Sequence, residues 1–161
     1  MTAARGCPVQ GRLSAIHRAA PAVFAHATLV IETHGAGFIE ITRDAARFVA
    51  ESCAIDGALF LFLRHTSASL LIQENADPDV CTDLRTALER LAPADAGWVH
   101  ATEGPDDMPA HVKTMLTGVS LHVPVADGKL VLGTWQGIYV VEHRSHAHRR
   151  EIVLQFVGST R

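Results

Sequence analysis

The sequence is poor in cysteine and in aromatic residues, and it contains no long apolar run. Only three of its 161 residues are cysteine, and none of them forms a CxxC motif. Three cysteines cannot all pair, so we expect no disulfide framework and predict a reducing, cytoplasmic location. The longest apolar run, Ala58–Leu63, is far below the roughly 18 residues that a membrane-spanning helix needs. No membrane partner is therefore expected.

The chain also lacks an excess of positive charge and the motifs of several large enzyme classes. Its 14 basic and 17 acidic residues give a net charge of −3, whereas a nucleic-acid binder needs a basic excess or stripe. No nucleic-acid partner is expected. The motifs GxGxxG, GxxxxGK[ST], HExxH and GxSxG are absent. Walker-type NTPases, simple Rossmann oxidoreductases, zincins and α/β-hydrolases thereby lose their main sequence support.

What is present is an apolar fraction of 48%, enough for one domain with its own core. We predict that residues 1–25 form a flexible N-terminal extension and that residues 26–161 form the folded domain. The Arg- and Ala-rich start is also typical of an organelle transit peptide, although a short loose tail is the simpler interpretation.

Turn residues and apolar periodicity predict an α+β fold, with two to three helices on one side of largely antiparallel sheet layers. Residues 27–33 and 38–41 are typical of two strands of a hairpin, followed by a helix that begins with Thr42 as N-cap and ends near Cys53. Asp56-Gly57 is expected to break the chain before a buried strand. The remaining strands are predicted over 58–64, 70–73, 120–125, 130–134, 138–144 and 151–157.

Two further helices are predicted from their end signals. Asp77 is a good N-cap and Pro78 fits the first helical position, so a helix is expected to run from there to just before Pro93. An aspartate of the Asp106-Asp107 pair is expected to cap a third, shorter helix, with Gly118 directly after its end.

Ten histidines stand out in the composition, because histidine suits proton transfer and metal ligation near neutral pH. His65-Thr66-Ser67 follows the most apolar strand, where it would make a phosphate-binding or proton-transfer corner. A histidine that caps a loop through a backbone carbonyl is an equal alternative. Glu74 and Asn75 would hold a metal or a substrate hydroxyl, or belong to the start of the helix.

The second group of candidates lies near the predicted third helix and at the end of the chain. His100, Glu103 and His111 are ligand types that bind divalent metals, although their spacing matches no standard zinc signature and a solvated surface helix is the alternative. Arg144 with Arg149 or Arg150 would hold a phosphate through paired donors. His146 and His148 lie in a predicted hairpin turn, where a solvated charged loop is the more common arrangement.

Four segments resemble, in order and with the right gaps, the YjbQ-like family: HTSASLLIQENADPDVCTDL, EGPDDMPAHVKTMLTG, LGTWQGIYVVEHR and RREIV. The resemblance covers residues 27–158. The family was long described as uncharacterised and now often carries the label secondary thiamine-phosphate synthase. The resemblance implies an α+β domain that assembles as a homotrimer, with its pocket at or near subunit boundaries. It also implies formation of thiamine phosphate from a pyrimidine pyrophosphate and a thiazole phosphate.

Matching the motifs residue by residue implies a set of site residues. Catalytic roles are expected for His65, His111, Glu142 and Arg144, with Glu142 orienting Arg144. Binding of substrate and phosphate is expected at Thr66, Ser67, Asn75, Lys113, Gln136 and Arg150. A divalent ion, Mg²⁺ or Zn²⁺, is expected on His65, His100, Glu103 and His111, unless these residues share proton transfer instead.

The resulting hypothesis is a transferase that displaces pyrophosphate from a phosphorylated small-molecule substrate. Such a leaving group needs cationic or metal stabilisation, and attack by the thiazole nitrogen needs positioning more than a general base. Two alternatives come from other classes: a non-catalytic trimeric module that binds a phosphorylated metabolite or a metal, and a metal-dependent phosphohydrolase. The sequence does not separate the three, because all of them use histidine, arginine and a divalent ion.

Overall fold

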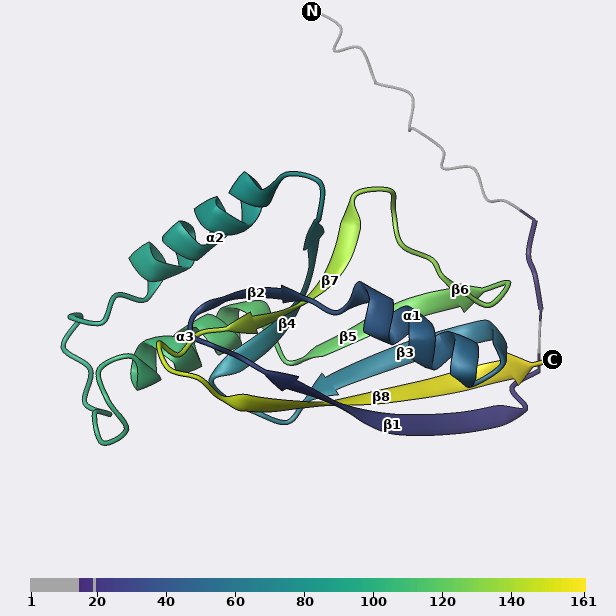
Figure 1. The fold of residues 1–161 in the computed structure, drawn as a ribbon, viewed down its shortest axis with the longest axis horizontal. Helices are drawn as coiled ribbons and strands as arrows, with labels where there is room; N and C mark the ends of the chain where they lie inside the picture. The colour runs from purple at the N-terminus through teal and green to yellow at the C-terminus, as the bar shows by residue number, and fades with distance from the viewer. Residues whose placement is uncertain (1–14, 19) are drawn as a thin grey trace, which may run out of the picture.

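The computed structural model describes residues 15–18 and 20–161, and its strands form two antiparallel sheets (Figure 1). The five-stranded sheet has the order β1-β8-β3-β5-β6, and the three-stranded sheet has the order β2-β7-β4. The strands are β1 Val23–Glu32, β2 Gly37–Glu40, β3 Ala54–Leu63, β4 Ala68–Glu74, β5 Ser120–Ala126, β6 Lys129–Leu130, β7 Gln136–Glu142 and β8 Arg149–Thr160. The helices are α1 Thr42–Glu51, α2 Pro78–Leu91 and α3 Asp107–Thr117. The predicted α+β class is confirmed.

The core lies between the two sheets and under α1. Alternate residues of β3 and β8, such as Leu61 and Leu154, point to one face of the five-stranded sheet, as the two-residue period of a strand requires. They form one buried cluster with Val49 of α1 and with Leu70 and Val140 of the smaller sheet. The opposite face of the five-stranded sheet carries exposed apolar side chains, among them Phe24, Val30 and Phe62.

The predicted hairpin of residues 27–33 and 38–41 is wrong, because its two strands enter different sheets. β1 pairs with β8, and β2 pairs with β7. The turn at residues 34–37 therefore carries the chain from one sheet to the other. Local alternation identifies a strand but carries no information about which strand lies beside it, and here tertiary packing decides the pairing.

Asp56-Gly57 does not break the chain, since both residues lie inside β3, which begins at Ala54. A register shift between Ala54 and Gly57 marks an irregularity of the β3–β8 ladder. A Cβ atom on Gly57 would lie 2.3 Å from the carbonyl oxygen of Val157. The glycine is thus needed for a close approach of two backbones rather than for a turn. The predicted strand over 130–134 is short, and ends at Leu130.

The predicted helix ends are confirmed at α2 and at the end of α3, and they differ at the starts of α1 and α3. Asp77 caps α2 as predicted, its carboxylate accepting from the backbone N–H of Asp79 at 2.9 Å. Thr42 is the first residue of α1 and not its N-cap, and its hydroxyl bridges instead to β7 by accepting from the N–H of Ile138 at 2.9 Å. Asp106 precedes α3 without capping it through its side chain, and Gly118 follows the end of α3 as predicted.

The helices are placed differently with respect to the core. α1 buries Ala45 and Val49, and α3 packs along β4 and buries Ala110 and Thr114. α2 has no buried residue and extends from the body of the molecule in Figure 1. No helix in the described part of the chain is long and apolar enough to cross a membrane.

β1 begins at Val23, so the strand includes the last residues of the predicted N-terminal extension. Residues 1–14 and 19 of that extension lie outside the described residues.

Candidate functional site

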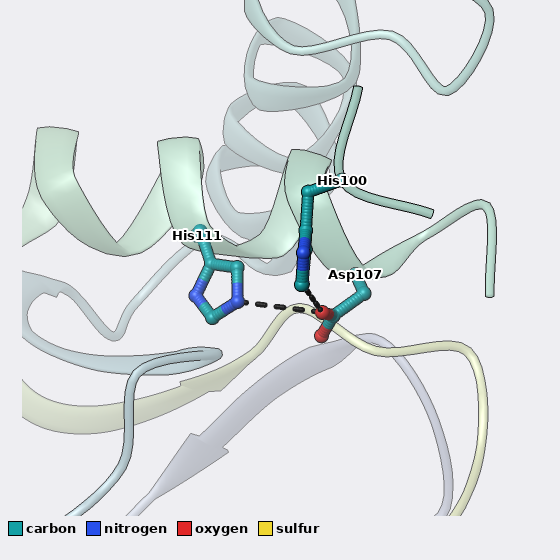
Figure 2. A group of neighbouring side chains, drawn as sticks. All are labelled: His100, Asp107 and His111. Carbon is teal, nitrogen blue, oxygen red and sulfur yellow. Dashed lines mark hydrogen bonds and ion pairs between the residues drawn. The ribbon is translucent and has the colours of Figure 1, made fainter. Parts of the chain in front are cut away.

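Two histidines converge on one buried carboxylate at the start of α3. Nε2 of His100 lies 2.8 Å, and Nε2 of His111 lies 3.3 Å, from Oδ2 of Asp107. One ligand atom from each of these residues lies within 4.8 Å of the others. Figure 2 shows both imidazoles directed at the same carboxylate, with Asp107 and His111 on α3 and His100 on the segment that precedes it. We call this group the His100–Asp107–His111 cluster.

Helix geometry explains the placement of two of the three side chains. Asp107 is the first residue of α3 and His111 lies four residues later, so both side chains project from one face of the helix. The side chain of Asp107 is only 2% exposed, whereas those of His100 and His111 are 45% and 33% exposed. The carboxylate therefore forms the floor of the cluster, and the imidazoles form a rim that solvent reaches.

A backbone carbonyl determines which nitrogen of His111 faces the cluster. Nδ1 of His111 lies 2.9 Å from the carbonyl oxygen of Thr66, and because a carbonyl only accepts, Nδ1 must carry the proton. When the ring is neutral, the lone pair of Nε2 faces Asp107. An unprotonated nitrogen beside a carboxylate oxygen is an arrangement that a shared cation would stabilise. A carbonyl that fixes the tautomer is also the usual outer support of a metal-binding histidine.

Arg144 holds the other oxygen of the same carboxylate. Its Nη1 donates to Oδ1 of Asp107, its Nη2 donates to the carbonyl oxygen of Glu103 at 2.6 Å, and its Nε lies 3.4 Å from Oδ2 of Asp106. The side chain of Arg144 is 9% exposed. Arg144 thus orients Asp107 and is not free to clamp a phosphate. Its contact with Oδ1 leaves Oδ2 of Asp107 for the two histidines.

The Asp106 carboxylate links the start of α3 to the turn between β7 and β8 through hydrogen bonds. Its Oδ2 accepts from the backbone N–H of Ser145 at 2.7 Å and from the hydroxyl of the same residue at 2.8 Å. Desolvation opposes ionisation here, but the two hydrogen bonds from Ser145 and the neighbouring Arg144 guanidinium outweigh it and lower the pKa of Asp106 to about 2.

Glu142 and Arg150 form a second, fully buried ion pair. Nε and Nη2 of Arg150 donate to the two oxygens of Glu142 at 2.7 and 2.6 Å. The carboxylate also accepts from the hydroxyl of Thr33 and from the backbone N–H of Arg144. Desolvation acts to raise the pKa of Glu142, but this set of hydrogen-bond donors outweighs desolvation and lowers the pKa. Glu142 therefore binds the guanidinium of Arg150 and not, as predicted, that of Arg144.

The Glu142–Arg150 ion pair argues against the predicted phosphate clamp at Arg150. Arg150 is 3% exposed, and its third contact is to the carbonyl oxygen of the buried Ser67, 3.4 Å from Nη2. Its donors thus face protein acceptors and not a surface that a phosphate would reach. A buried pair of this kind is expensive to break, since removal of either partner leaves an uncompensated charge.

His65 lies beside the cluster but is not a member of it. Its Nε2 accepts from the backbone N–H of Glu151 at 2.9 Å, so that nitrogen is not free to bind a metal, although His65 was predicted as a ligand. Burial lowers the pKa of His65, and the Arg150 guanidinium lowers it further. His65, Thr66 and His111 line a common pocket of about 580 Å³.

Glu103, the fourth predicted ligand, does not join the cluster either. Its side chain is 71% exposed, with a carboxylate oxygen 3.8 Å from Nη1 of Arg144. Lys113 lies two residues after His111, about 200° around the helix from it. Desolvation lowers the pKa of Lys113, and Glu89 of α2 partly opposes the shift. Both residues therefore lie apart from the position where the histidines meet.

Asn75 and Gln136 lie at the other end of the three-stranded sheet. Ala68 pairs with Glu142 at one end of the β4–β7 ladder, and Glu74 pairs with Gln136 at the other end. Six residues of strand separate the two ends by about 20 Å. Asn75 lines a separate cavity of about 300 Å³, and the side chain of Gln136 accepts from the N–H of Gly133 at 2.8 Å. Within one chain, these residues are not brought to the histidines.

Asp107 is the member of the cluster that the sequence analysis missed as a candidate. The Asp106-Asp107 pair was interpreted only as a helix cap, yet the Asp107-xxx-His111 spacing on a predicted helix was a usable signal for two ligands on one face. Thr33 was missed as well, and no local pattern connects it to Glu142, a residue 109 positions away.

The fold and the cluster together define a small α+β protein with two antiparallel sheets and a His–Asp–His site at one helix start. Residues 27–159 match the family model described as UPF0047 protein YjbQ-like, so the chain belongs to the YjbQ-like family.

The chain is 47% identical over 131 residues to the UPF0047 protein sll1880 of Synechocystis, a match that covers 81% of this chain and 89% of that protein. It is 39% identical over 132 residues to the UPF0047 protein YjbQ of Escherichia coli O157:H7, covering 81% and 96%. Among solved structures, it resembles a YjbQ/UPF0047 family protein from Clostridium acetobutylicum with a TM-score of 0.76 and 36% identity, covering 81% and 98%. These matches establish the family and the fold.

Proposed function

We propose that this protein is a divalent-metal-dependent enzyme that acts on a phosphorylated small molecule. The candidate reaction joins a pyrimidine pyrophosphate to a thiazole phosphate and releases pyrophosphate, which gives thiamine phosphate. The convergence of His100 and His111 on Oδ2 of Asp107 carries the proposal. The label of the resembling family supplies the candidate substrates.

The three residues suit a divalent cation. Two imidazoles and one carboxylate are a common ligand set for Zn²⁺ and related ions, and three protein ligands leave a coordination position for water or substrate. A divalent cation bound there would stabilise the negative charge that develops on a pyrophosphate leaving group. Mg²⁺ is the less favoured of the two predicted ions, because it prefers oxygen ligands.

The surrounding residues favour a site that is organised in advance. The carbonyl of Thr66 fixes the tautomer of His111, and Arg144 fixes one oxygen of Asp107. Both contacts reduce the reorganisation that binding of a metal ion would otherwise require. Since Arg144 and Arg150 are held by carboxylates, the charge for a phosphate group has to come mainly from the metal, which is a reason to favour a metal-dependent mechanism.

The test is thiamine phosphate formation by the full chain after Zn²⁺, Mn²⁺ or Mg²⁺ is added and after treatment with EDTA. We expect turnover with one of the ions and none after EDTA. Asp107→Asn should abolish turnover, while Asp83→Asn, on the exposed surface of α2, should leave it unchanged. A metal-replete protein without turnover would contradict the transferase. Tight retention of the pyrimidine pyrophosphate would then indicate a binding module, and phosphate release from the thiazole phosphate alone would indicate a phosphohydrolase.

We also propose that the chain acts as a homotrimer in the cytoplasm. Phe24, Val30 and Phe62 are exposed and share the outer face of the five-stranded sheet by their register, and α2 buries none of its residues in a single chain. Exposed apolar surface of this extent is typical of an interface. Light scattering should give three times the chain mass of 17.3 kDa, and a monomer at micromolar concentration would contradict the assembly.

A further inference from the structure

The outer face of the five-stranded sheet, on which the homotrimer proposed above would assemble, carries two exposed histidines. They are His26 of β1 and His122 of β5. In the strand register, His26 lies opposite Gln155, which lies opposite Phe60. Phe60 in turn lies opposite His122. Because Leu61, the residue after Phe60, is buried, the side chains of this row point outward. We call these four residues the outer histidine row.

Both imidazoles of the row lie beside an aromatic ring. The ring centroids of Phe24 and His26 are 6.0 Å apart, and those of Phe60 and His122 are 5.0 Å apart at an interplanar angle of 78°. Three strand spacings separate the two histidines by about 14 Å, so they do not share one ligand within a chain. Each histidine therefore meets a second copy of the chain as part of a separate, mainly apolar contact.

The charged groups of the described strands lie away from the outer histidine row. The outward side chains that adjoin the row are uncharged: Phe24, Thr28, Ala58, Phe62, Ser120, Pro124, Val153 and Val157. Glu151 lies four residues along β8 from Gln155, a distance of about 13 Å, and it binds Arg64 and Arg149. The other charged groups are near the ends of the strands, namely Glu32 beside Arg149, Asp56 beside His17, Asp127, and Lys129. No carboxylate of the described strands therefore stabilises a protonated imidazole of the row.

We propose that the outer histidine row makes assembly of this chain sensitive to protons, so that neutral His26 and His122 permit contact between copies and their protonation separates the copies. The inference rests on the proposed homotrimer and adds its regulation. Contact with a second copy removes both imidazoles from water. A neutral imidazole tolerates this transfer, whereas an imidazolium that is covered without a carboxylate beside it is costly. Free chains then bind more protons than the assembly does, so a fall in pH favours the free chains.

The experiment measures the dissociation constant of the assembled full chain at pH 7.5 and at pH 5.5. Analytical ultracentrifugation and mass photometry follow the oligomeric state over a dilution series down to nanomolar concentration at constant ionic strength. The series is repeated with the double variant His26→Gln, His122→Gln, which keeps two neutral polar side chains in the row. The matched control is the double variant His34→Gln, His146→Gln, because both of these histidines are exposed and lie outside the strands. All variants retain the His100–Asp107–His111 cluster.

A histidine that has to stay neutral in an assembly raises the dissociation constant by about tenfold between pH 7.5 and pH 5.5. With two such positions in each chain, we expect a rise of at least about 100-fold for the wild type and for the His34, His146 variant. The His26, His122 variant should show little change. If that variant assembles poorly at pH 7.5, each single variant at His26 or His122 should retain about half of the wild-type effect on a logarithmic scale.

Failure of the proposed assembly gives a different result from failure of this inference. A wild type that is monomeric at pH 7.5 contradicts the homotrimer and the inference together. A homotrimer that is equally stable at both pH values, or that does not dissociate at pH 5.5 at any concentration tested, overturns the inference alone. The same rise in the His26, His122 variant as in the wild type also overturns it, because acid unfolding or another group would then cause the dissociation.

Discussion

The guanidinium of Arg144, from the segment that follows β7, donates to Oδ1 of Asp107, the first residue of α3. This contact joins two elements that are 37 residues apart in the chain. It directs the second oxygen, Oδ2, toward His100 and His111. One buried ion pair thus connects the packing of α3 against the sheets to the geometry of the candidate metal site.

Arg144→Lys should weaken metal binding more than it weakens the fold. Lysine keeps the charge but lacks the planar set of donors that holds Asp107 and the Glu103 carbonyl together. Loss of such a supporting contact typically lowers metal affinity by about 10- to 100-fold. The affinity for Zn²⁺ is measured by competition with a chelator. Arg64→Lys, at an exposed arginine that pairs with Glu151, is the control and should bind Zn²⁺ as the wild type does.

Metal should raise the melting temperature through the cluster. A ligand that binds only the folded state at 100 times its dissociation constant adds about 2.7 kcal/mol, which corresponds to roughly 5–10 °C for a chain of this size. Differential scanning calorimetry with and without Zn²⁺ measures the shift. Asp107→Asn should abolish it and Asp83→Asn should retain it. An equal shift in both variants would place the metal elsewhere.

Glu142→Gln should cost about 3–5 kcal/mol of unfolding free energy, because it leaves the buried Arg150 guanidinium without its counterion. Urea unfolding at pH 7 measures the loss. The double variant Glu142→Gln, Arg150→Met should recover part of it, since an apolar side chain has no charge to compensate. A loss below about 1 kcal/mol in the single variant would mean that the pair contributes no more than an exposed salt bridge.

Glu142 should also make the unfolding free energy sensitive to acid. The pKa of Glu142 is lowered in the folded protein from its ordinary value of 4.5, so its contribution is complete above that value and is lost as the pH falls through the lower, folded pKa. The pKa of Asp106, about 2 in place of 3.8, extends the loss to lower pH. Unfolding free energies measured from pH 6 to pH 2 should therefore fall most steeply below about 4.5 in the wild type. Glu142→Gln should show a shallower decline.

His143 should make the unfolding free energy depend on pH in a second range. Its Nε2 lies 2.9 Å from the Ser69 hydroxyl in a buried pair. Burial, with a smaller contribution from the charge of Lys113, lowers its pKa from 6.5 to about 4. The folded state thus favours neutral His143, and stability that is complete above pH 6.5 is lost as the pH falls toward 4. The difference is on the order of 3 kcal/mol. NMR should detect no titration of His143 above pH 5, and a midpoint near 6.5 would contradict its burial.

Local signals accounted for much of the fold. The Asp77-Pro78 start of α2, the glycine after α3 and the apolar alternation of most strands each act through neighbouring residues, so one sequence is enough to identify them. His100 and His111 were identified as candidate ligands from residue type and from the resemblance. The third member, Asp107, belongs to the aspartate pair that was interpreted only as the source of a helix cap, because a helix start and a metal site use the same kind of side chain.

The sequence by itself thus determined the α+β class, most elements and two of the three residues of the cluster. Only the tertiary structure decided that β1 and β2 enter different sheets and that Arg144 and Arg150 are bound by Asp107 and Glu142. It also decided that Asn75 and Gln136 lie about 20 Å along the strands from Glu142. The reason is physical: helix ends and strand periods depend on residues a few positions apart, whereas ion pairs and sheet order depend on which distant segments the core brings into contact.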